Sequence, residues 1–158
     1  MIVSDSTTLI ILLDLDKIDL LSNLFPKIII PEAVYQEITF KNPLKETSFI
    51  EVRQAKNSEL LEALTMMLDK GESEAIALAV ELKLKLIIDE KKGRKIAMNQ
   101  GIEIIGLLGV IYLNAIKGFL TITQAKTFLS NAIHHGYRIN QDLVDNMLMQ
   151  LKKDLNLS

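Results

Sequence analysis

Residues 1–10 have the sequence MIVSDSTTLI, in which a short apolar run ends at Asp5 and is followed by a helix start. Residues 1–3 predict a short buried strand. The hydroxyl residues Ser6-Thr7-Thr8 are typical of a helix N-terminus, and the apolar run 9–13 predicts the helix itself. Asp5 is therefore expected at the carboxyl end of a strand, where the ligands of open α/β sheets bind.

The same order of strand and helix recurs along the chain. The β-branched run 28–30 predicts a strand that is covered on both faces, followed by a helix from Pro31-Glu32. Residues 85–88 predict a third strand with a helix over 91–99 after it, and residues 102–105 predict a last strand. Strands that alternate with helices indicate a parallel sheet between layers of helices.

The remaining segments complete this α/β pattern. We expect a loop over 41–48, an edge strand over 49–52, and further helices over 18–25, 60–68 and 71–83. No convincing strand follows Gly106. Asn140 predicts the N-cap of a final helix, whose apolar stripe consists of Leu143, Val144, Met147, Leu148 and Leu151.

The size and composition of the chain set limits on its class. Its 158 residues fit one domain, residues 1–158, of which residues 119–158 form a helical extension. Cysteine is absent, which excludes disulfides and thiolate metal sites. No membrane span or secretory signal is recognisable, which favours the cytoplasm. The net charge of −2 gives no global attraction to nucleic acid. A mean hydropathy of +0.24, together with the C-terminal stripe, predicts a homodimer.

Four acidic residues stand next to four separate apolar segments of the chain. Asp5 and Asp89 each follow a predicted strand, Glu37 lies in the helix after residues 28–30, and Glu74 opens the apolar segment 75–79. Three of them have a plainer explanation. Asp5 and Asp89 could cap the helices that follow them, and Glu37 could be an exposed helix residue. Four acids in corresponding positions are explained less well by capping.

Glu72 is the alternative to Glu74. In a regular helix the two side chains point about 160° apart, so both cannot face one pocket. Glu72 in the first turn would also interact favourably with the helix dipole. The sequence leaves open which of these two glutamates belongs with the other three acids.

These acids predict a metal site. A cluster of carboxylates repels itself unless protons or a cation neutralise it. Oxygen ligands without His or Cys favour Mg²⁺ or Mn²⁺ over zinc. Such ions activate water and hold phosphoryl oxygens during in-line displacement, so the expected reaction is phosphoester hydrolysis.

A basic run follows Asp89 immediately. Lys91, Lys92 and Arg94 lie at the start of a predicted helix, where cations oppose the helix dipole. A nucleic-acid backbone bound to this run would lie beside the acidic residues. The alternative is a solvated helix face with a local salt bridge.

Taken together, these motifs resemble the PIN-domain family, in particular its small prokaryotic branch that is similar to VapC-type toxins. The resemblance covers about residues 1–120 in order, and the tail more loosely. It rests on the following segments: VSDSTTLI at 3–10, IPEAVYQEI at 30–38, GESEAIALA at 71–79, IIDEKKGR at 87–94, GLLGV at 106–110 and KGFL at 117–120.

The resemblance implies a three-layer α/β/α sandwich with a central parallel sheet, and RNA cleavage that depends on Mg²⁺ or Mn²⁺. The family's acids correspond to Asp5, Glu37 and Asp89, and its third acid, usually Asp, corresponds to Glu74. Toxins of this kind act on RNA, are paired with an antitoxin protein and often dimerise. The sequence therefore predicts the endoribonuclease toxin of a toxin–antitoxin pair. The alternative is a PIN-fold module that binds RNA or protein without cutting.

Overall fold

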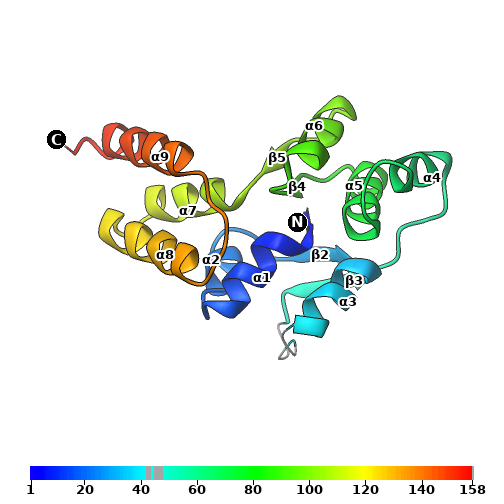
Figure 1. The fold of residues 1–158 in the computed structure, drawn as a ribbon, viewed down its shortest axis with the longest axis horizontal. Helices are drawn as coiled ribbons and strands as arrows, with labels where there is room; N and C mark the ends of the chain where they lie inside the picture. The colour runs from blue at the N-terminus through cyan, green and yellow to red at the C-terminus, as the bar shows by residue number, and fades with distance from the viewer. Residues whose placement is uncertain (42–43, 45–47, 158) are drawn as a thin grey trace.

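The structure, a computed structural model, describes residues 1–41, 44 and 48–157. Most of the predicted loop 41–48 therefore lies outside the described residues. Within them, five parallel strands form one sheet in the order β3-β2-β1-β4-β5 (Figure 1). The strands are β1 (Ile2–Ser4), β2 (Ile28–Pro31), β3 (Ile50–Arg53), β4 (Leu86–Ile87) and β5 (Ile104–Ile105).

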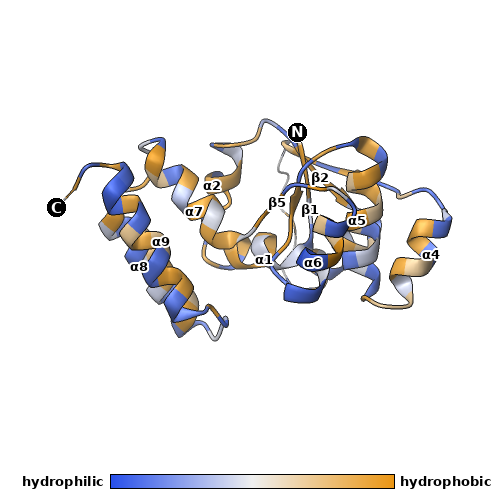
Figure 2. Ribbon diagram, turned by 90° about the horizontal axis from the view of Figure 1, so that it is seen from above, coloured by the Kyte–Doolittle hydropathy of each residue, from blue (hydrophilic) through white to orange (hydrophobic). Residues whose placement is uncertain are grey.

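Helices cover both faces of this sheet, and the predicted three-layer α/β/α sandwich is confirmed (Figure 2). The first core packs one sheet face against α1, α2, α7, α8 and α9, with part of α3, and the second packs the other face against α4, α5 and α6. The helices span α1 (Ser6–Asp14), α2 (Asp19–Ser22), α3 (Glu32–Lys41), α4 (Glu59–Thr65), α5 (Lys70–Leu82), α6 (Lys91–Asn99), α7 (Leu107–Ile116), α8 (Ile122–His134) and α9 (Gln141–Asp154).

The β-branched strands contribute side chains to both cores, because successive side chains of a strand point to opposite faces of the sheet. Ile28 and Ile30 of β2 belong to the first core, whereas Ile29 belongs to the second. All three are completely buried. This is why the run 28–30 has no polar alternation, as the sequence predicted for a strand covered on both sides.

Strand order reverses between β1 and β4. The chain passes outward from β1 to β2 and β3, then returns to place β4 on the other side of β1. Val3 pairs with Leu86 and Ser4 with Ile87, so the carboxyl ends of these two strands lie side by side. Such a switch point is where open α/β sheets bind their ligands.

The last three helices pack together, and α7 joins them to the sheet at β5. Phe128 and Leu129 of α8 and Val144 of α9 enter the first core, and Figure 2 shows both helices with alternating apolar and polar stripes. The side chain of Asn140 accepts from the amide of Leu143, so the predicted N-cap is confirmed. No helix in the described part of the chain combines the length and apolarity needed to cross a membrane.

Candidate functional site

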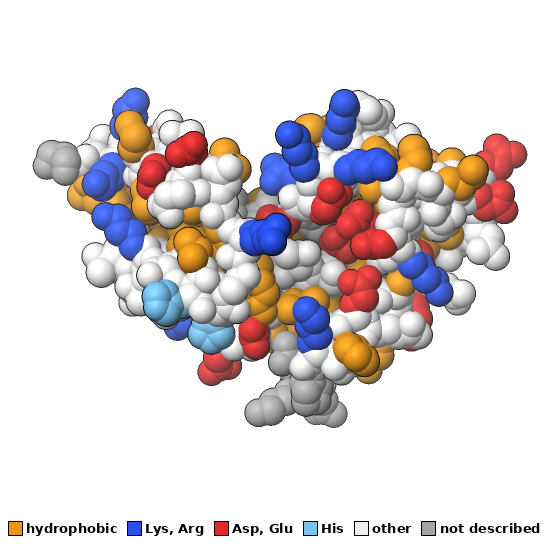
Figure 3. All heavy atoms as spheres, viewed as in Figure 1, with side chains coloured by type: hydrophobic (Ala, Val, Ile, Leu, Met, Phe, Trp, Pro, Cys, Tyr) orange, Lys and Arg blue, Asp and Glu red, His pale blue; other side chains and the backbone are white. Residues whose placement is uncertain are grey.

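The face over the switch point is acidic. Figure 3 shows Asp and Glu side chains gathered where α1, α3, α5 and α6 meet, with Lys and Arg side chains beside them on α6. A cavity of about 630 Å³ opens there, and Asp5, Glu37, Asp69 and Glu72 contribute to its walls. Asp5 stands at the start of α1, Asp69 and Glu72 at the start of α5, and Glu37 within α3. The fold therefore brings together acids from three separate helices.

Asp5 lies at the centre of this face. The residue is only 4% exposed, and its backbone amide donates to the carbonyl oxygen of Ile87 across the strands (2.9 Å). Asp5 occupies the N-cap position of α1, but its side chain makes no capping hydrogen bond. The capping explanation therefore does not account for this buried carboxylate.

The protonation of Asp5 reflects this position. Burial, reinforced by the negative charges of Glu37, Asp69 and Asp89, raises the pKa of the Asp5 carboxyl from 3.8 to about 7, although the backbone amide of Ser6 opposes the shift. Desolvation and like charges both disfavour the ionised form of an acid. A cation bound beside Asp5 would favour the ionised form and offset this shift.

Glu37 faces Asp5 from α3. The hydroxyl of Ser6 donates to its Oε2 (2.7 Å), so a residue adjacent to Asp5 holds the Glu37 carboxylate. Its Oε1 lies against Gly71 in α5, so closely that a Cβ at residue 71 would overlap it. The serine of the first helix and the glycine of the fifth therefore fix where this carboxylate lies.

Glu72, and not Glu74, lines the cavity that contains Asp5 and Glu37. Burial, followed by the negative charge of Asp69 and then that of Asp5, raises the pKa of the Glu72 carboxyl. Glu74 is 8% exposed and lines a separate cavity of about 280 Å³ between α3, α4, α5 and the segment 54–57. The two glutamates therefore face different cavities, as the helical geometry predicted.

Asp89 does not cap α6, the helix that follows it in the sequence. Its Oδ1 accepts from the amide of Leu107 (2.9 Å), the first residue of α7, and its Oδ2 accepts from the hydroxyl of Thr8 in α1. The N-cap of α6 is instead Glu90, whose side chain accepts from the amides of Lys92 and Gly93. Asp89 thus joins α1 and α7 at the switch point.

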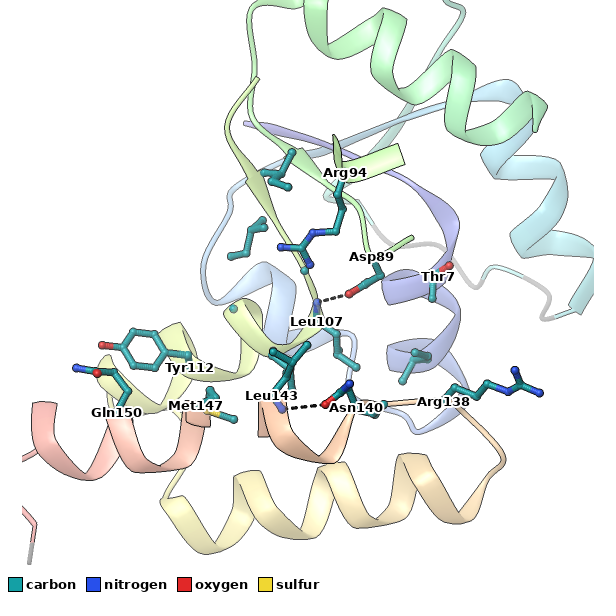
Figure 4. Close-up of a pocket in the computed structure, with 17 residues that line it drawn as sticks. Thr7, Asp89, Arg94, Leu107, Tyr112, Arg138, Asn140, Leu143, Met147 and Gln150 are labelled. Atoms are coloured by element: carbon teal, nitrogen blue, oxygen red, sulfur yellow. Dashed lines mark hydrogen bonds between the residues drawn. The ribbon is translucent and has the colours of Figure 1, made fainter. Parts of the chain in front are cut away.

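A second cavity, of about 640 Å³, begins at Asp89 and runs between α7 and α9. Figure 4 shows Arg94 and Asp89 at one end of it, and Leu143 and Met147 of α9 along one wall. The Nη1 of Arg94 and the Oδ1 of Asp89 both lie within 3 Å of the point where a Cβ at Gly106 would stand (2.9 and 2.7 Å), so glycine leaves room for them. On α6, the two lysines that precede Arg94, at positions 91 and 92, are exposed.

The donor chemistry of this face fits a hard divalent cation. Asp5, Glu37, Glu72 and Asp89 provide only carboxylate oxygens, which Mg²⁺ and Mn²⁺ prefer. In the part of the chain that the structure describes, however, no three acidic or histidine side chains are arranged as a metal-binding group. Glu37 and Asp89 also accept hydrogen bonds from protein donors, which leaves each of these oxygens a second lone pair for a cation.

Asp69 is a member of this site that the sequence pattern did not single out. Its side chain caps α5 by accepting from the amide of Glu72 (2.8 Å), and its charge raises the pKa of Asp5. The signal was present, because Asp69 and Glu72 have the spacing of a capping box. With Asp69 as the N-cap, the helix begins at residue 70 and not at residue 71 as predicted, and Glu72 lies in its first turn.

Comparison with known protein families supports this description of the fold. A family model described as a PIN domain matches residues 1–153, which is nearly the whole chain. No curated protein matches the chain significantly.

Proposed function

The chain belongs to the PIN-domain family, and on that premise we propose that it is a metal-dependent endoribonuclease, the toxin component of a toxin–antitoxin pair. PIN domains are generally nucleases, and PIN nucleases generally use divalent metals. The observation that supports the proposal most is the buried carboxylate of Asp5 at the switch point, whose pKa burial and the surrounding acids raise. A protein without a cation to bind would gain stability by replacing it.

In this proposal Asp5, Glu37, Glu72 and Asp89 hold Mg²⁺ or Mn²⁺. The bound ion would supply Lewis acidity and lower the pKa of water. Glu37, which Ser6 orients, would also position the water for attack on the phosphorus atom. The basic residues of α6, namely Lys91, Lys92 and Arg94, would hold the phosphates of the RNA strand next to the acids, because cations neutralise the backbone charge.

The proposal predicts that Glu72 and Glu74 differ. Glu72→Gln replaces a carboxyl group of the cavity shared with Asp5 by an amide, which cannot ionise to bind a cation. It should lower RNA cleavage by about tenfold or more, as the loss of a group near a metal does. Glu74→Gln, the matched control, makes the same chemical change in a different cavity and should cleave at close to the parental rate. The measurement is degradation of single-stranded RNA with Mn²⁺ and with EDTA. A parent protein that degrades RNA equally in both would disprove metal dependence.

A second prediction concerns Gly71→Ala, which should lower the rate of RNA cleavage without lowering the stability of the protein. A Cβ at this position meets only the Glu37 carboxyl group at close range, so Gly71→Ala should move that carboxylate. Cleavage should fall about tenfold to a hundredfold, because small misplacements of reacting groups are costly. The free energy of unfolding should stay level or rise by about 0.5–1 kcal/mol, since alanine favours a helix.

The control for this prediction is the same substitution in a Glu37→Gln background. If Gly71 acts only through Glu37, the second substitution adds little to the first. Independent, multiplying effects would show that residue 71 affects cleavage by some other route.

One observation favours the second candidate, a PIN-fold module that binds without cutting. No three acids of the described chain already form a metal-binding group. Cleavage that requires Mn²⁺ would support the nuclease over the binding module.

The toxin role is tested by induced expression, since a toxin arrests growth whereas its Asp5→Asn variant does not. An antitoxin partner and a homodimer belong to the same proposal, and light scattering at micromolar concentration tests the dimer.

A further inference from the structure

Phe40 is an aromatic side chain that lies almost entirely in solvent. It stands in the last turn of α3 and is 90% exposed. Aromatic side chains bury large apolar areas when they can, so one left in water is informative when other features point to a ligand. The position of Phe40 relative to the acidic cavity supplies such a feature.

Phe40 lies on the same face of α3 as Glu37. Residues three and four apart are neighbours on a helix surface, so Glu37, Phe40 and Lys41 form one continuous strip. All three line the cavity of about 630 Å³ that contains Asp5 and Glu72. At 1.5 Å per residue, Phe40 stands about 4.5 Å along the helix axis from Glu37. The aromatic ring is therefore part of the wall of the candidate site.

Two lysines of this cavity complement a negatively charged ligand. Lys41 follows Phe40 directly, and Lys70 opens α5 on the opposite wall. Both belong to a cavity whose inner end is acidic. An occupant that contacts all of these groups needs an apolar flat surface for Phe40, negative charge for the lysines and an oxygen near the carboxylates. A nucleotide of an RNA strand has these three properties.

We propose that Phe40 is a stacking platform for an unpaired base of the RNA, next to the phosphate held at the acidic residues. The inference rests on the proposed nuclease function and assigns the ring to unpaired bases, because the bases of a duplex are already stacked and cannot reach it. Lys41 and Lys70 hold the phosphates that flank this base.

A second copy of the chain is the other occupant that would cover an exposed phenylalanine. The neighbours of Phe40 in this cavity favour RNA instead. The strip around it contains Gln36, Glu37 and Lys41, and the opposite wall contains Lys70. A protein contact of this kind would bury four polar or charged side chains around one ring, which is costly unless each finds a partner.

The experiment compares Phe40→Ala, Phe40→Leu and Phe40→Trp with the parent. Stacking contributes to substrate and transition state alike, so Phe40→Ala should raise KM for a short oligoadenylate at least about fivefold with little change in kcat. Phe40→Leu keeps an apolar side chain without a ring face and should also lose affinity, whereas Phe40→Trp should retain it. Met66→Ala is the matched control, because Met66 is 87% exposed at the end of α4 and lies outside this cavity.

A binding measurement separates this inference from the nuclease proposal. The chain contains no Trp, so Phe40→Trp introduces a single tryptophan, whose emission can be excited selectively. In the Asp5→Asn background with Mg²⁺, oligoadenylate should quench its emission, and the same strand annealed to its complement should quench it far less. If this quenching occurs although the parent protein never cleaves RNA, the platform is supported and the nuclease proposal is refuted.

Two results would contradict the role proposed for Phe40. A parental KM for Phe40→Ala, together with emission of the Phe40→Trp protein that oligoadenylate does not quench, would overturn the inference while leaving cleavage intact. A change of oligomeric state in light scattering without a change of KM would overturn it too, and would assign Phe40 to a protein contact.

Discussion

Asp5→Asn should lower the rate of RNA cleavage by more than about a hundredfold. The amide keeps the size and shape of the side chain but removes the charge that, in the proposed function, holds a cation at the switch point. Metal stabilisation of the transition state is worth several kcal/mol, and each 1.36 kcal/mol is a factor of ten in rate. The measurement is the single-turnover rate on single-stranded RNA with saturating Mn²⁺.

Asp16→Asn is the control for this substitution. It makes the same chemical change at an exposed residue just after α1, where asparagine tolerates the left-handed backbone (φ 55°). It should cleave RNA at the parental rate. If Asp5→Asn also retained that rate, the buried carboxylate would have no part in the reaction and the nuclease proposal would fail.

The second large effect concerns stability. In EDTA, the parent protein should lose stability relative to Asp5→Asn as the pH rises from about 4 to about 7. The pKa of Asp5 is raised from 3.8 to about 7 by burial and by neighbouring acids, so the folded protein holds a proton that the unfolded chain releases. Stability falls with pH wherever the folded state binds more protons.

The size of this effect follows from the shift in pKa. A change from 3.8 to about 7 corresponds to roughly 4 kcal/mol as an upper value, and relaxation around the ionised group will reduce it. Urea denaturation of parent and Asp5→Asn at about pH 4 and about pH 8, on either side of this window, measures the difference directly. A stability difference that does not change between these pH values would show that Asp5 ionises freely in the folded protein.

Added metal should reverse this loss. A cation that binds only the folded protein stabilises it by about 2.7 kcal/mol when present at 100 times its dissociation constant. At a pH above the titration window, where Asp5 is ionised, Mn²⁺ should therefore raise the melting temperature of the parent protein. It should have little effect on the melting temperature of Asp5→Asn. This measurement requires no RNA.

The sequence predicted the sheet and the two central acids because both follow from local pattern. The run 28–30 has no polar residue and the run 85–88 has only Lys85 at its start, and strands buried on both faces need no polar alternation. Parallel strands then place the residues that follow them at one edge. Asp5 and Asp89 were found in this way, and the structure puts both beside the switch point between β1 and β4.

The details of the site depend on features that a local pattern does not contain. Whether Glu72 or Glu74 faces Asp5 is decided by the rotation of α5, and each residue turns the helix by about 100°. The partners of Asp89 lie in α1 and α7, far away in the sequence. The exposure of Phe40 likewise results from tertiary packing, because nothing in its neighbours distinguishes it from a core phenylalanine.

The hydrogen bond from the amide of Leu107 to Asp89 limits which residues could replace Asp89 during evolution. The carboxylate that faces the cavity also secures the first turn of α7, and α8 and α9 pack on that helix. A descendant without the proposed nuclease activity would therefore still need a hydrogen-bond acceptor at position 89. Asparagine there would preserve the architecture, whereas alanine would leave a buried amide without a partner and loosen the whole C-terminal third.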